Sequence, residues 1–171
     1  SLTIDNGGAA GANNAFVNEA NALVIDAVRT VATFDLVAGG GLTDNAGNGI
    51  AATSARLNVG TGNNIGTVVN RLDIAVANLT IDDGGLAGTN SAFVREADAL
   101  VIDTVRAAGT FDLVAGGDLT DNSANGIFAP DVVLNVGGTN DIGTGANRMN
   151  LDVDSLTIRN GAANGADNAI L

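Results

Sequence analysis

The sequence repeats itself at a fixed interval of 77 residues. The segment from Leu2 to Ala77 returns from Leu79 to Asp154, and a third copy begins at Leu156. The two full copies align without a gap and are identical at about six positions in ten. A long repeat without gaps predicts that each copy is a structural unit that stacks on the next one. The copies cover residues 1–77, 78–154 and, in part, 155–171.

Short segments in which buried-type and solvent-type positions alternate recur within each copy. Phe34, Leu36 and Ala38, for example, alternate with Asp35 and Val37. A period of two residues is typical of a β-strand with one buried face and one wet face. Clusters of Gly, Asn and Asp lie between these segments and predict turns. Helical spacing is not sustained anywhere, so we expect an all-β protein of short strands.

A solenoid explains the repeat better than a sandwich or a closed barrel. A closed barrel does not accept an ungapped repeat that runs into a third copy, whereas a solenoid extends without limit. The copy length divides into about four coils of about 20 residues, a length typical of β-helices. Phe111, Val133 and Leu156 lie 22 and 23 residues apart and are expected to stack. The sequence therefore predicts a parallel β-helix that is one continuous solenoid over residues 1–171.

The alternation also predicts which side chains face the core. We expect six to be buried, namely Ile25, Leu36, Leu57, Ile102, Leu113 and Leu134. Four are expected outside, namely Asp35, Asn58, Asp112 and Asn135. Leu113→Asp would then bury an unpaired charge at a cost of several kcal/mol, and Asp112→Asn would cost little.

Several segments resemble a known group of proteins. They are FDLVAGGDLTD (residues 111–121), LNVG (134–137), DIGT (141–144), NRMNLDV (147–153) and SLTI (155–158). This pattern is similar to the repeats of filamentous-haemagglutinin-like adhesins and related autotransported exoproteins, which are giant bacterial surface proteins. The resemblance implies a right-handed parallel β-helix, export to the extracellular cell surface, and a structural role in an adhesin shaft or in an extracellular filament or sheath.

Composition and charge exclude several classes of function. The chain has no Lys, His, Cys, Trp or Tyr, and its net charge is −12. The usual nucleophile–base pairs and zinc sites therefore lack their residues. A strongly acidic surface repels nucleic acid, and no apolar stretch is long enough to insert into a membrane. We expect the partners to be like chains or neighbouring copies in a fibre whose axial repeat is about four coils, roughly 19 Å, with surface glycans as a further class.

Calcium is the ligand hypothesis that the residues support best, because it takes oxygen ligands from carboxylates and turn carbonyls. Its weak candidates are Asp118, Asp121, Glu96 and Asp98, although the calcium-binding nonapeptide and EF-hand patterns are both absent. No catalytic, cofactor or metal residue is therefore assigned.

An enzyme is not expected. β-Helices do host polysaccharide-degrading enzymes that use paired carboxylates. However, the other copy has Gly41 in place of Asp118 and Asn21 in place of Asp98. The alternatives to a structural role are a glycan- or calcium-binding module and, more distantly, a polysaccharide-degrading enzyme.

Overall fold

The computed structural model describes residues 1–6, 13–45, 47, 49–82, 88–122, 125–160 and 169–171. Over these residues the chain forms strands joined by turns and loops, with no helix. The strands are β1 (Leu2–Asn6), β2 (Ala15–Glu19), β3 (Leu23–Thr30), β4 (Thr33–Ala38), β5 (Leu42–Asp44), β6 (Gly49–Val59), β7 (Leu72–Asp82), β8 (Ala92–Glu96), β9 (Leu100–Arg106), β10 (Thr110–Ala115), β11 (Leu119–Asp121), β12 (Ile127–Phe128), β13 (Asp131–Val136), β14 (Leu151–Asp152) and β15 (Ser155–Asn160).

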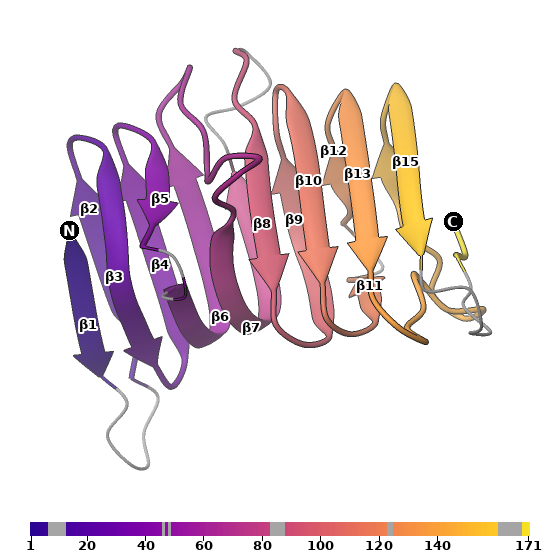
Figure 1. The fold of residues 1–171 in the computed structure, drawn as a ribbon, viewed down its shortest axis with the longest axis horizontal. Coiled ribbons are helices and arrows are strands. Elements are labelled where there is room, and N and C mark those ends of the chain that lie inside the picture. The colour runs from indigo at the N-terminus through magenta and orange to yellow at the C-terminus, as the bar shows by residue number, and fades with distance from the viewer. Residues whose placement is uncertain (7–12, 46, 48, 83–87, 123–124, 161–168) are drawn as a thin grey trace.

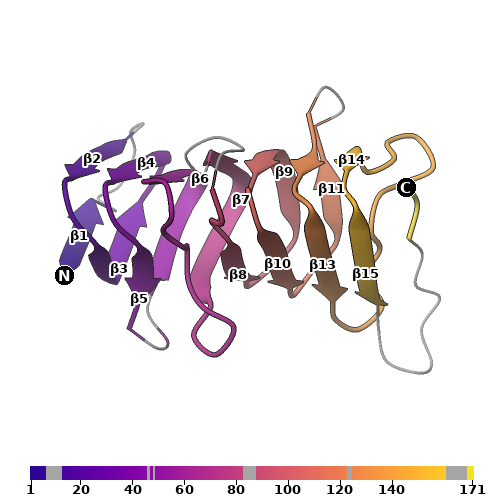
Figure 2. The same ribbon diagram turned by 90° about the horizontal axis from the view of Figure 1, so that it is seen from above.

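All strand pairings among the described residues are parallel, and the strands form one sheet that winds around a common axis. Figures 1 and 2 show two layers. We call the layer with β1, β3, β8, β10, β13 and β15 the front layer, and the layer with β2, β4, β9, β12 and β14 the back layer. The long strands β6 and β7 run through both layers, since β6 pairs with β3 through its first half and with β4 through its second. The predicted fold class, an all-β parallel β-solenoid, is confirmed.

One coil of the solenoid takes about twenty residues. In the front layer Ile4 pairs with Val28, Val28 with Ile50 and Ile50 with Ile74, in steps of 24, 22 and 24 residues. Other steps are shorter, such as the 19 residues from Val17 to Leu36 in the back layer. These side chains point inward and stack as columns, because successive strands of a parallel sheet place residues of the same register above one another.

The expected stacking of Phe111 on Val133 is wrong by one residue. Phe111 pairs with Val132, and Val132 pairs with Leu156. The Gly and Asn turns between strands vary in length, so residue spacing alone does not determine the register.

The 77-residue copy corresponds to three and a half coils rather than the expected four. Three coil steps lead from Ile4 to Ile74, and seven further residues along β7 carry the chain to Ile81, which pairs with Leu57 in the back layer. Ile158, the third equivalent position, lies in the front layer again, where it pairs with Leu134. Each copy therefore advances about 17 Å, for coils about 4.8 Å apart, and turns by half a revolution.

The half turn places identical sequences in opposite layers. β4 and β10 share the hexapeptide Thr-Phe-Asp-Leu-Val-Ala. β4 pairs with β2 and the second half of β6 in the back layer, whereas β10 pairs with β8 and β13 in the front layer. β8 and β13 are the second-copy equivalents of β2 and of the second half of β6, so β4 and β10 have equivalent neighbouring strands. The side chains on those strands differ wherever the two copies differ in sequence.

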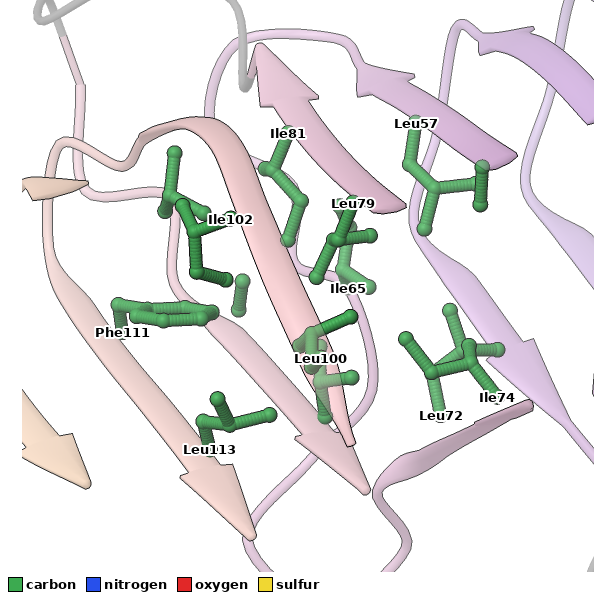
Figure 3. Close-up of a cluster of buried hydrophobic side chains, with 14 of the residues drawn as sticks. Leu57, Ile65, Leu72, Ile74, Leu79, Ile81, Leu100, Ile102, Phe111 and Leu113 are labelled. Atoms are coloured by element: carbon green, nitrogen blue, oxygen red, sulfur yellow. The ribbon is translucent and has the colours of Figure 1, made fainter. Parts of the chain in front are cut away.

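A single aliphatic core runs along the axis between the two layers, and Figure 3 shows its central part. The side chains that the alternation placed inside are confirmed, since each is at most 1% exposed: Ile25, Leu36, Leu57, Ile102, Leu113 and Leu134. The equivalent residues Phe34 and Phe111 are its largest fully buried side chains. A core this narrow is built mostly from aliphatic side chains, in keeping with a chain that has only five aromatic residues, all Phe.

One of the four residues expected outside is buried. Asp35, Asn58 and Asn135 are partly exposed, but Asp112 is only 9% exposed. The Arg71 side chain reaches Asp112, and its guanidinium donates to Oδ2 at 2.8 Å and to the backbone oxygen at 3.1 Å. Asp112 therefore does lie on the outward side of β10, but Arg71 covers it. Because Asp112 is buried and paired, Asp112→Asn is expected to cost more than its outward position in the alternation predicts.

Candidate functional site

The structure places Glu96 inside the solenoid rather than on a ligand-binding surface. Glu96 is 2% exposed and stacks between Ile74 and Ala115. Its carboxylate accepts hydrogen bonds from the backbone N–H groups of Val76, Ala97 and Asp98. Burial raises its pKa to about 7 despite these donors. The Glu96 carboxylate therefore binds the backbone N–H groups of the turn that follows β8.

Asp121 is a second buried carboxylate with a structural partner. It is 3% exposed, and its Oδ2 accepts hydrogen bonds from the backbone N–H and the side-chain amide of Asn150, at 2.6 and 2.9 Å. The equivalent Asp44 accepts the backbone N–H of Asp73 at 2.8 Å. Burial also raises the pKa of Asp44, and the nearby negative charge of Asp73 adds to the rise. Both residues hold the chain of the next coil in register.

The two remaining calcium candidates, Asp118 and Asp98, are exposed. Asp118 accepts the backbone N–H of Asp141 at 2.9 Å. Among the described residues no group of three or more acidic side chains is placed to hold a metal ion. The four candidates therefore bind backbone donors or face solvent, and the structure does not assemble them into one site.

A cleft lies on the outer side of the front layer. It has a volume of about 290 Å³ and lies over β3, β6, β7 and the end of β8. We call it the alanine cleft, because Ala51, Ala75 and Ala97 line it together with the charged side chains of Arg29 and Arg95. Asp73 is the one acidic residue among the described residues of the lining, and its Oδ1 accepts a hydrogen bond from the Arg95 guanidinium at 3.4 Å. No ion pair among the described residues involves Arg29.

The equivalent surface of the second copy has different occupants. Arg29 pairs with Ala51, and Ala51 with Ala75, whereas the matching positions hold Arg106, Phe128 and Asp152. The Arg106 guanidinium lies over the Phe128 ring, 5.1 Å from its centre. The ring therefore fills in the second copy the space that Ala51 leaves open in the first.

Sequence reasoning missed the alanine cleft. Most of its lining residues are Gly, Ala and Arg, which match no motif. The repeat also draws attention to the positions that the copies share. The available signal was the opposite one, namely the positions at which two otherwise similar copies differ, such as Ala51 and Phe128. A change from an aromatic to a methyl side chain at an outward position signals a local loss of surface volume.

No protein-family model, curated protein or solved structure matches the chain. The described part of the chain has no helix long and apolar enough to span a membrane. The β-solenoid fold is therefore the level at which the chain is classified.

Proposed function

We propose that this chain is a structural, non-catalytic repeat segment of a secreted bacterial surface protein, which forms the shaft of an adhesin or part of an extracellular filament or sheath. The observation that carries the proposal is the continuity of the core. The inward column of Ile4, Val28, Ile50 and Ile74 passes from coil to coil. The buried Glu96, whose carboxylate accepts backbone hydrogen bonds, carries the column on to Ala115. Each coil is held to the next by parallel backbone hydrogen bonds along its strands, which resist bending and separation.

The geometry of the repeat supports extension by whole copies. Since Ile81 and Ile158 follow Ile4 at half-turn intervals, adding a copy continues the same columns and only alternates the layers. A rod built in this way lengthens by about 17 Å per copy at constant thickness. Neighbouring copies of the same array are thus the first partners of each copy.

The proposed extracellular location rests on three features of the sequence. The repeats are similar to those of filamentous-haemagglutinin-like adhesins, and the chain has no cysteine and a net charge of −12. A high net charge keeps a long polymer soluble and prevents rods from aggregating side by side.

Insertion of complete copies tests the proposal. Variants of the 171-residue chain with one and two extra segments 78–154 are measured by small-angle X-ray scattering and electron microscopy. We expect the long dimension to rise by about 17 Å for each insertion while the cross-section stays constant. A shorter, thicker or misfolded product would contradict the role of each copy as a rigid spacer in a shaft or filament, which we call the spacer role.

Location is tested separately in the bacterium that produces the protein. An antibody against the folded segment should label intact cells, and protease added outside should remove the signal. A segment that becomes accessible only after lysis would contradict the surface role and leave the rod geometry intact.

A further inference from the structure

The second copy shows what kind of group fits the alanine cleft of the first. Arg29 and Arg106 are equivalent, and each is the pairing neighbour of an outward residue in the next coil. In the second copy that residue is Phe128, whose ring packs under the Arg106 guanidinium. In the first copy it is Ala51, and Arg29 instead borders a cleft of about 290 Å³. The side chain that would complete the arrangement is missing there.

The charges of the cleft define a second requirement. Among the described residues that line it, Arg29 and Arg95 are basic and Asp73 is acidic, so these residues carry a net positive charge on a protein whose net charge is −12. Ala75 replaces Asp152 of the second copy, so a carboxylate next to the ring position is missing as well.

We infer that the alanine cleft binds an aromatic carboxylate, with its ring over Ala51 against the Arg29 guanidinium and its carboxylate over Ala75 near Arg95. The inference does not depend on the spacer role. A guanidinium attracts the face of an aromatic ring, and it also pairs with carboxylates through two parallel hydrogen bonds. The cleft volume of about 290 Å³ is close to about 300 Å³, the lower end of the range for small-molecule sites, and suits a ligand with a single ring. The small side chains of Ala51, Ala75 and Ala97 let the ring approach the sheet closely.

The same chemistry is available from a free aromatic acid or from an aromatic residue beside an acidic one in a peptide. Two probes therefore represent the ligand: 3-phenylpropionate and the dipeptide acetyl-Phe-Asp-amide. Two analogues test the features that carry recognition, namely 3-cyclohexylpropionate, which lacks the π-system, and 3-phenylpropanol, which lacks the charge.

Binding is followed by amide chemical shifts of the 171-residue protein during titration. We expect saturable shifts confined to β3, β6, β7 and β8 with at least one probe, and binding at least threefold weaker for both analogues. The probe that binds more tightly identifies the source. Absence of saturable shifts with both probes, or equal binding of 3-cyclohexylpropionate, would overturn the inference.

Two variants connect binding with the cleft. Ala51→Phe introduces the residue that the second copy carries at this position, so the fold is retained while the ring fills the cleft and saturable binding is lost. Val37→Phe adds the same ring at an exposed position of β4 in the back layer and should leave binding unchanged. Arg29→Gln should weaken binding by about threefold to thirtyfold. Retained binding by a folded Ala51→Phe variant, shown by an unchanged far-ultraviolet spectrum, would refute the site.

Discussion

Asp112 and Asp35 lie in identical local sequences, so substitutions at the two positions compare a buried ion pair with an exposed one. Both occupy the third position of the same hexapeptide, in β10 and β4. Asp112 pairs with Arg71 at 2.8 Å, and their side chains are 12% and 13% exposed. Asp35 lies 3.6 Å from Arg56, and their side chains are 33% and 60% exposed. The perturbation is the change of each Asp to Asn.

The expected costs differ because only one pair is removed from water. Breaking a buried ion pair by removing one partner costs about 3–5 kcal/mol, since the other charge stays buried without compensation. The side-chain amide oxygen of Asn and the backbone oxygen of residue 112 still accept hydrogen bonds from Arg71. Oδ1 of Asp112 has no hydrogen-bond partner among the described residues. We therefore expect about 2–4 kcal/mol for Asp112→Asn. Asp35→Asn should cost less than about 1 kcal/mol, as exposed pairs do.

The assay is urea unfolding followed by far-ultraviolet circular dichroism, with amide hydrogen exchange as a local readout. Because the coils of a solenoid open partly independently, exchange should accelerate in β8, β10 and β13 for Asp112→Asn and stay unchanged for Asp35→Asn. Arg71→Gln combined with Asp112→Asn should cost less than the sum of the single changes. Equal costs for the two Asp→Asn changes would refute the claim that burial of the pair decides the outcome.

Three further changes test other features of the structure. Burial raises the pKa of Glu96 to about 7 in the folded protein, so its contribution to stability is full below pH 4.5 and is lost as the pH rises through 7. The free energy of unfolding in urea should therefore fall between pH 5 and pH 8, and Glu96→Gln should flatten this dependence. An unchanged slope in the variant would exclude Glu96 as its source. Gly116→Ala places a Cβ 2.2 Å from the carbonyl oxygen of Ala97 and should lower the melting temperature by several degrees, unlike an Ala substitution at Gly137, where the space is open. Excess chelator should lower the melting temperature if calcium is a structural ligand, and an unchanged melting curve would remove calcium from the account.

The sequence determined the architecture because its signals are local and periodic. Alternation reports which face of a strand is buried, and this depends only on the two-residue period of the extended chain. The alternation therefore identifies Leu36 and Leu113 as core residues, and the ungapped repeat predicts a fold that extends along one axis. The sequence shows that Glu96 is acidic, but it does not show that the carboxylate is buried or that its partners are backbone N–H groups.

Only the tertiary structure decided which residues meet across coils. Arg71 and Asp112 are 41 residues apart, and their contact depends on the summed lengths of every turn between them. The strand and turn lengths of one copy add up to three and a half coils, so equivalent residues of successive copies alternate between the two layers. Ala51 lies beside Arg29 for the same reason, and the difference from Phe128 acquires meaning only when the neighbour is known. The alternation of buried and exposed side chains depends only on residues within one strand. The register between coils depends on all the preceding turns, because each turn of a different length shifts the pairing of every strand that follows it.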